Sequence, residues 1–179
     1  MREQSAEAQY ASQRIDDLLQ KKSQRYRTYV GDNQFIGKSI AKLRPYDLDS
    51  NRVEIGKYVG RVMLIQTLNF WCGSPEKQLP AIKHTMKIFP KMKPIFMDYG
   101  ESADELKLRY FTKPASRFLK DQTVVFADSA TDELLPDGRP VGLILLIDKK
   151  GIVRSVFPGN SKDLERMLQE KVRMLMNEK

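Results

Sequence analysis

The sequence predicts an α/β fold in three layers, a mixed central sheet flanked by helices, with a helical extension at the N-terminus. Short apolar runs typical of buried strands alternate along the chain with segments whose apolar residues recur at helical spacing. The order is hairpin, β, α, β, α, β, β, α, which implies parallel and antiparallel strands in one sheet with helices on both faces. A hydrophobic fraction of 41% and a charged fraction of 30% are typical of a globular chain.

Residues 1–37 are predicted to form the helical extension and a linker, with the linker over residues 31–37. Apolar residues at helical spacing, from Ala11 to Leu19, indicate a short amphipathic helix. A basic patch follows it, made of Lys21, Lys22, Arg25 and Arg27. These cations are interleaved with Tyr26 and Tyr29, which suits either a protein-docking arm or RNA, and a solvated helix end gives the same pattern. We favour protein docking over RNA.

The globular domain is predicted over residues 38–179, and its strands have distinct signals. The turn-formers Asp49, Ser50 and Asn51 interrupt an alternating pattern, which indicates a hairpin. Residues 62–68 form a mostly apolar run with Gln66 as its polar interruption, as expected of a central strand buried on both faces. The predicted hairpin and further strands are residues 45–55, 94–99, 123–127, 142–148 and 152–157, the last two joined by Lys-Lys-Gly.

Three helices are predicted in this domain. The first follows residue 75 and carries a core stripe of Leu79, Ile82, Met86 and Phe89. Ser102 is expected to cap a second helix that runs to about Tyr110, and residues 113–121 are irregular or a short helix. The last helix is expected to be capped by Asn160 or Ser161. Its residues at helical spacing are Leu164, Met167, Leu168, Lys171, Val172 and Leu175.

The candidate for chemistry is the junction between the central strand and the first of these helices. The single cysteine, Cys72, stands there beside the single tryptophan, Trp71, and three positions before Pro75. A helix N-terminus favours a thiolate through its backbone N–H groups and macrodipole. One cysteine excludes an intramolecular disulfide and a cysteine-rich metal centre, and we predict no metal and no cofactor. His84 lies 12 residues further on, roughly 18 Å along a helix, and is excluded as the base of Cys72.

Three segments carry a resemblance to a known family. They are the lead-in over residues 37–65, F-W-C-G-S-P-E-K-Q-L-P, and L-I-L-L-I-D-K-K-G-I-V-R. Together they resemble the thioredoxin fold, in its redoxin branch of TlpA and ResA type. That family has a second cysteine where this chain has Pro75, and a cis-proline six residues before the aspartate that corresponds to Asp148. Gly142 occupies the latter position and Pro140 comes two residues earlier, so the resemblance implies this fold with a degenerate active site.

The C-terminal segment is also similar to a second family. V-G-L-I-L-L-I-D-K-K-G-I-V-R resembles the assembly factors of the mitochondrial ATP synthase, which are degenerate thioredoxin folds, although Ser155 replaces the tryptophan that follows their arginine. This resemblance implies a mitochondrial, non-catalytic role. The acidic residues among the first 29 positions argue against an intact transit peptide, and the cytosol is the alternative location.

The net charge of +8 predicts an acidic partner, an anionic membrane surface or nucleic acid, or a generally basic surface with no single ligand. Lys83, Lys87 and Lys91 step by four and are expected to form one helical stripe, either a docking face for an acidic partner or a solvated face. No apolar run is long enough to cross a membrane.

These observations lead to two functional hypotheses. The first is a non-catalytic thioredoxin-fold protein that serves as an accessory subunit or assembly factor of a mitochondrial complex with acidic surfaces. The alternative is a monothiol thiol–disulfide oxidoreductase or a peroxidase that uses Cys72. The missing second cysteine favours the non-catalytic hypothesis.

Overall fold

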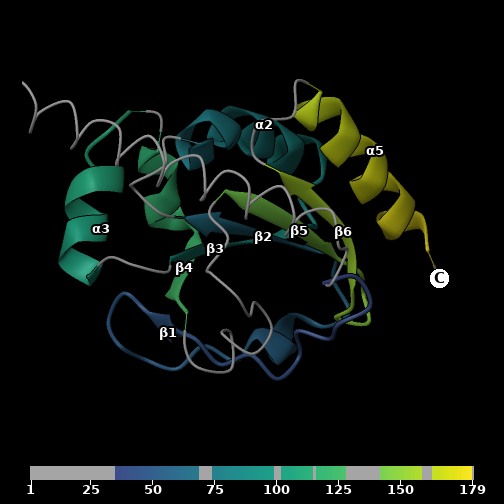
Figure 1. Ribbon diagram of the computed structural model, residues 1–179, viewed down its shortest axis with the longest axis horizontal. Helices are drawn as coiled ribbons and strands as arrows, with labels where there is room; N and C mark the ends of the chain where they lie inside the picture. The colour runs from purple at the N-terminus through teal and green to yellow at the C-terminus, as the bar shows by residue number, and fades with distance from the viewer. Residues whose placement is uncertain are drawn as a thin grey trace, which may run out of the picture. The chain divides into compact units, whose positions relative to one another are not determined.

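The strands of the domain assemble into a single mixed sheet. The computed structural model describes residues 35–68, 74–98, 102–114, 116–127, 142–158 and 163–178. Within them six strands pair in the order β1-β4-β3-β2-β5-β6 (Figure 1). Their bounds are β1 Tyr46–Asp47, β2 Met63–Leu68, β3 Lys93–Asp98, β4 Thr123–Phe126, β5 Leu143–Ile147 and β6 Val153–Pro158. β2, β3 and β4 run parallel, whereas β5 is antiparallel to both β2 and β6.

β2 lies between β3 and β5 in the interior of the sheet, and its residues are buried on both faces. All six side chains of β2 are buried, as the apolar run predicted. Residues Leu64 and Leu68 belong to the cluster that packs beneath the helices, and the alternate residues Met63 and Ile65 are equally buried on the other face.

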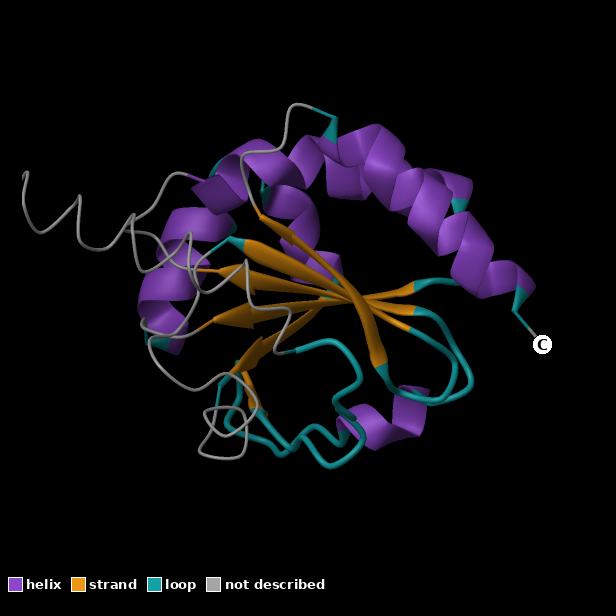
Figure 2. Cartoon of the chain, turned by 45° about the vertical axis from the view of Figure 1, so that its right-hand side comes forward, coloured by secondary structure: helices purple, strands orange, loops and turns teal. Residues whose placement is uncertain are grey.

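The described helices are α2 (Ser74–Ile88), α3 (Ala103–Tyr110) and α5 (Leu164–Asn177), with 3-10 helices η1 (Ile55–Tyr58) and η2 (Arg117–Asp121). Helices α2 and α5 lie along one face of the sheet and η1 lies toward the other (Figure 2). The cluster between sheet and helices joins residues from every layer on that side. Its members include Leu64, Leu79, Ile82, Phe96, Leu106, Ile144, Leu168 and Val172.

Local signals account for several boundaries. Ser102 caps α3 in a reciprocal capping box: Ser102 Oγ accepts from the Glu105 N–H, and the Glu105 carboxylate accepts from the Ser102 N–H. The residues Lys149–Gly151 form the tight turn between β5 and β6, with Gly151 at φ 79°. Both features confirm the sequence predictions.

The hairpin predicted over residues 45–55 is present but short. Its arms are joined by the bridge between Tyr46 and Arg52 and by backbone hydrogen bonds from the Asp47 N–H to the Asn51 carbonyl and from the Val53 N–H to the Pro45 carbonyl. Asp47 stabilises the turn by accepting from the N–H groups of Asp49 and Asn51, and β1 also pairs with β4. One predicted boundary was wrong in detail. The N-cap position of α5 is Asp163, so its first turn begins later than a cap at Asn160 or Ser161 would allow.

The start of the domain lies slightly earlier than the predicted position. Phe35 is 1% exposed, and the Gly37 N–H donates to the Val153 carbonyl at 2.9 Å. The last residues of the predicted linker therefore pack with the sheet. The predicted helix and the basic patch of the extension lie outside the described residues.

Candidate active site

The described residues frame the junction that carries Cys72. β2 ends at Leu68 and α2 begins at Ser74, so the predicted arrangement of strand, link and helix is present. Cys72 and Trp71 belong to the five-residue link, residues 69–73, which lies outside the described residues. The described residues on either side of that link form the frame of the site.

Two buried glutamines connect the elements around this junction. Gln66 Nε2 donates to the Pro75 carbonyl oxygen at 3.0 Å and to Gln78 Oε1 at 2.8 Å. Gln78 Nε2 donates in turn to the Gly142 carbonyl oxygen at 2.7 Å. Both side chains are 0% exposed, so these hydrogen bonds form without competition from water. The resulting network ties β2, the start of α2 and the residue before β5 together.

Thr67 makes a second connection at the same edge of the sheet. Its hydroxyl accepts from the Leu143 N–H at 2.8 Å and lies 3.3 Å from the Leu143 carbonyl oxygen. The Thr67 carbonyl accepts from the Gly142 N–H at 3.3 Å. The side chain thus replaces backbone pairing where the β2–β5 ladder ends, and it positions the entry into β5.

The two positions that depart from the redoxin pattern lie within this network. Pro75 is buried in the first turn of α2, where a missing N–H costs no helical hydrogen bond. Gly142 has φ 72°, a left-handed conformation that suits glycine. The described residues contain no cis peptide bond, and Pro140 lies outside them. The carbonyl oxygens of Pro75 and Gly142 accept hydrogen bonds from Gln66 and Gln78 respectively, and these bonds hold both positions in place.

Asp98 is a residue at this edge that the sequence analysis did not select. It ends β3, is 0% exposed, and is paired in register with Leu68, the last residue of β2. A buried carboxyl group beside the end of the central strand is an uncommon feature and is a further polar side chain of this edge. Its signal in the sequence was a single acidic residue closing the apolar run Pro-Ile-Phe-Met.

The histidine and lysines proposed from the sequence lie away from this edge. His84 is exposed on α2, which is continuous from Ser74, and its Nδ1 lies 2.5 Å from Glu165 Oε1 on α5. Lys83 is also exposed, and its ammonium lies 5.3 Å from the Phe118 ring centroid. His84 therefore links two helices, as a surface residue.

The predicted lysine stripe is not continuous. Lys83 and Lys87 are exposed on α2, but the helix ends at Ile88, and Lys91 belongs to the turn that leads into β3. Pro90 explains the ending, since the residue before a proline is disfavoured in helical conformation. Lys91 instead lines a pocket at the opposite edge of the sheet from the end of β2.

Comparison with solved structures agrees with this architecture. A thiol:disulfide interchange protein of DsbE type from Chlorobium tepidum superposes with a TM-score of 0.65, at 16% identity over 79% of this chain and 98% of the other. The chain has a thioredoxin-like fold.

Two further structures have the same architecture. A secreted Mycobacterium tuberculosis disulfide oxidoreductase has a TM-score of 0.59, at 10% identity over 75% of this chain and 97% of its own. The thioredoxin domain of a Bacteroides vulgatus thiol-disulfide oxidoreductase has a TM-score of 0.58, at 18% identity over 76% and 97% respectively. Identities this low establish the fold alone.

These neighbours support the resemblance to the thioredoxin fold and give no support to the resemblance to ATP synthase assembly factors. No protein-family model matches the chain, and no curated protein matches its sequence. Among the described residues, no helix is both long and apolar enough to cross a membrane.

Proposed function

We propose that this protein acts in thiol–disulfide exchange as a monothiol redoxin, with Cys72 as the reacting thiol. One observation carries the proposal: in a thioredoxin-like fold, the single cysteine falls in the link between β2 and α2, two residues before the first residue of the helix. A thiol close to a helix N-terminus has its thiolate stabilised, and the thiolate is the nucleophile. The neighbouring structures, a thiol:disulfide interchange protein and two disulfide oxidoreductases, support the same chemistry.

The reaction proceeds in two exchanges. The Cys72 thiolate attacks one sulfur of a substrate disulfide, a new S–S bond forms, and the other substrate sulfur leaves as a thiolate. Because Pro75 stands where a resolving cysteine would be, the mixed disulfide is not released internally. An external thiol of glutathione type attacks the substrate sulfur of that mixed disulfide, becomes joined to the substrate, and releases the Cys72 thiolate.

The pH dependence of Cys72 alkylation tests the proposal. We expect a thiol pKa clearly below the free value of about 8.5, and turnover of hydroxyethyl disulfide with glutathione that is lost in Cys72→Ser. An alkylation midpoint at or above the free value, together with absent turnover of both this disulfide and hydrogen peroxide, contradicts the enzymatic function.

Pro75→Cys is the complementary variant. It restores the redoxin spacing of two cysteines, the second of them in the first turn of α2, so oxidation should consume both thiols and insulin reduction should no longer need the external thiol. The single variants Cys72→Ser and Pro75→Ala serve as controls for the loss of the thiol and of the proline. A double-cysteine variant whose two thiols stay free under oxidation would show that the Cys72 link does not place its sulfur near position 75.

A second candidate function is non-catalytic binding, as an accessory subunit or assembly factor of a mitochondrial complex. Pro75 and Gly142 favour it, because both positions lack the redoxin residues and are instead held by the Gln66–Gln78 network. Native affinity purification of the wild type and Cys72→Ser separates the two functions. A partner retained equally by both supports the binding function, whereas partners captured through a reducible bond to Cys72 support exchange chemistry.

A further inference from the structure

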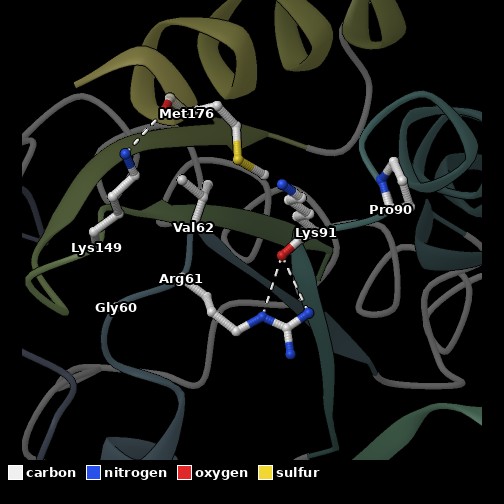
Figure 3. A pocket seen from close by; sticks show the side chains of 7 residues that line it. All are labelled: Gly60, Arg61, Val62, Pro90, Lys91, Lys149 and Met176. Atoms are coloured by element: carbon white, nitrogen blue, oxygen red, sulfur yellow. Dashed lines mark hydrogen bonds between the residues drawn. The ribbon is translucent and has the colours of Figure 1, made fainter. Parts of the chain in front are cut away.

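A pocket lies at the edge of the sheet opposite to the end of β2. It is formed where the chain enters β2 and β3 and where it leaves β5 and α5. Its volume is about 480 Å³, within the range of about 300–1,000 Å³ typical of small-molecule sites. The lining residues are Gly60, Arg61, Val62, Pro90, Lys91, Lys149 and Met176 (Figure 3).

Three of the lining residues are cationic, and two of them are held in place by backbone carbonyls. Arg61 donates from Nε and Nη2 to the Lys91 carbonyl oxygen at 3.2 and 3.1 Å. Lys149 Nζ donates to the Met176 carbonyl at 2.9 Å and also to the Glu178 carbonyl, at the C-terminal end of α5. A carbonyl bears only a partial charge, and so does a helix C-terminus, so these bonds orient the cations and compensate their charge only in part. In the described part of the chain, Arg61, Lys91 and Lys149 form no ion pair with a carboxylate, and no carboxylate lines the pocket.

The remaining lining is apolar. Val62 is 1% exposed and belongs to the core, whereas Pro90 and Met176 present apolar surface beside the cations. An occupant with an apolar body and an anionic group would satisfy both parts. The anion would relieve the mutual repulsion of three positive charges gathered around one hollow, and the body would cover the proline and thioether surface.

We propose that this pocket binds a small organic anion whose phosphate or carboxylate group contacts Arg61, Lys91 and Lys149. The site is independent of Cys72, since it lies at the far edge of the sheet and contains no residue of the candidate active site. Binding at this edge would make the protein responsive to a phosphorylated or carboxylated compound.

Titration of the full chain with phenyl phosphate, benzoate, inorganic phosphate and benzyl alcohol tests the site. By NMR, phenyl phosphate or benzoate should shift the Gly60 amide and the Met176 methyl resonances, and affinity should fall as salt rises. The stronger of the two identifies the preferred anionic group. Inorganic phosphate should bind more weakly because it lacks the apolar body. Equal shifts with uncharged benzyl alcohol, or shifts confined to other residues, would overturn the proposal.

Lys91→Glu is the decisive variant because the Lys91 side chain makes no hydrogen bond or ion pair in the described residues, so its loss leaves the fold intact. We expect it to weaken binding of the better anion by about tenfold or more, the effect of losing one charge-assisted contact. Lys87→Glu, an equal charge change on the exposed face of α2, is the matched control and should alter affinity less than twofold.

Equal losses of affinity in Lys91→Glu and Lys87→Glu would show a general charge effect and overturn the site. Cys72→Ser should bind as the wild type does, which separates this result from the fate of the proposed exchange chemistry.

Discussion

At the scale of single residues, the buried amides of Gln66 and Gln78 decide how the edge around the candidate site is held. Gln66 Oε1 has no hydrogen-bond partner among the described residues, while its Nε2 serves two acceptors. Buried amides of this kind are costly unless they are bonded. Their role is therefore to bond the carbonyl oxygens of Pro75, in the first turn of α2, and of Gly142, just before β5.

We expect Gln78→Leu to lower the free energy of unfolding by about 2 kcal/mol. Leucine keeps the approximate volume but leaves the Gly142 carbonyl and one Gln66 N–H without their partner, and each such loss costs about 1–3 kcal/mol. Urea unfolding at neutral pH measures the change. Gln169→Leu is the control, because the half-buried Gln169 on α5 bonds only Glu165 one turn earlier, and it should change stability by less than about 0.5 kcal/mol. Equal effects of the two substitutions would show that the network contributes nothing particular.

At the scale of elements, the β5–β6 hairpin is closed by a single carboxylate. Asp148 Oδ1 accepts from the N–H groups of Lys150 and Ile152 at 2.9 and 3.0 Å, and Oδ2 accepts from Arg154 Nη1 at 2.9 Å. Burial by itself raises the pKa of Asp148, but the hydrogen bonds from Ile152, Arg154 and Lys150 outweigh it and hold that pKa below its ordinary value of 3.8. The turn therefore stabilises the ionised form of the Asp148 carboxyl group.

Asp148→Asn is expected to cost about 1.5 kcal/mol at pH 7, the usual contribution of a hydrogen bond to a charged group. Because the folded-state pKa is lowered, the stabilisation is complete above the ordinary value and is lost as pH falls through the folded value. The difference between the wild type and the variant should therefore close in acid. Unfolding curves at a series of pH values measure it, with the exposed Asp121→Asn as control. A difference that stays constant into acid would exclude the charge as its cause.

The two ends of α2 lie beside two different sites, which the sequence pattern did not distinguish. The start of the helix belongs to the candidate active site, whereas its end at Ile88 leads through Pro90 and Lys91 into the pocket. The lysine stripe predicted from spacing was therefore wrong at its last member, because spacing of four carries meaning only while the helix continues.

At the scale of the whole molecule, the domain depends on the residues that enter it from the N-terminal side. The Phe35 ring is buried, and the backbone of residues 37–40 pairs with the outer turn of the β5–β6 hairpin through Val153 and Gly151. The unit that contains the sheet accordingly begins at Phe35.

A pair of truncations tests this boundary. Removal of residues 1–34 should leave a cooperative unfolding transition, whereas removal of residues 1–37 should lower stability further, by about 3–5 kcal/mol for the lost aromatic side chain. The matched point variant is Phe35→Ala in the full chain, which should reproduce most of the second effect. Two truncations of equal stability would place the start of the domain at Lys38 instead.

The sequence by itself determined the strands, the helices and their order, because burial imposes periods of two and 3.6 residues that remain legible along the chain. It also located Cys72, Pro75 and Gly142 as the positions that distinguish the two functional hypotheses. Only the tertiary structure decided what holds those positions, since Gln66 reaches Gln78 over 12 residues and Gln78 reaches Gly142 over 64. The basic pocket belongs to the same class of feature, because its cations come from three separate turns and meet only when the sheet has formed. Periodicity reports which way a side chain faces, and it carries no information about which distant residue it will face.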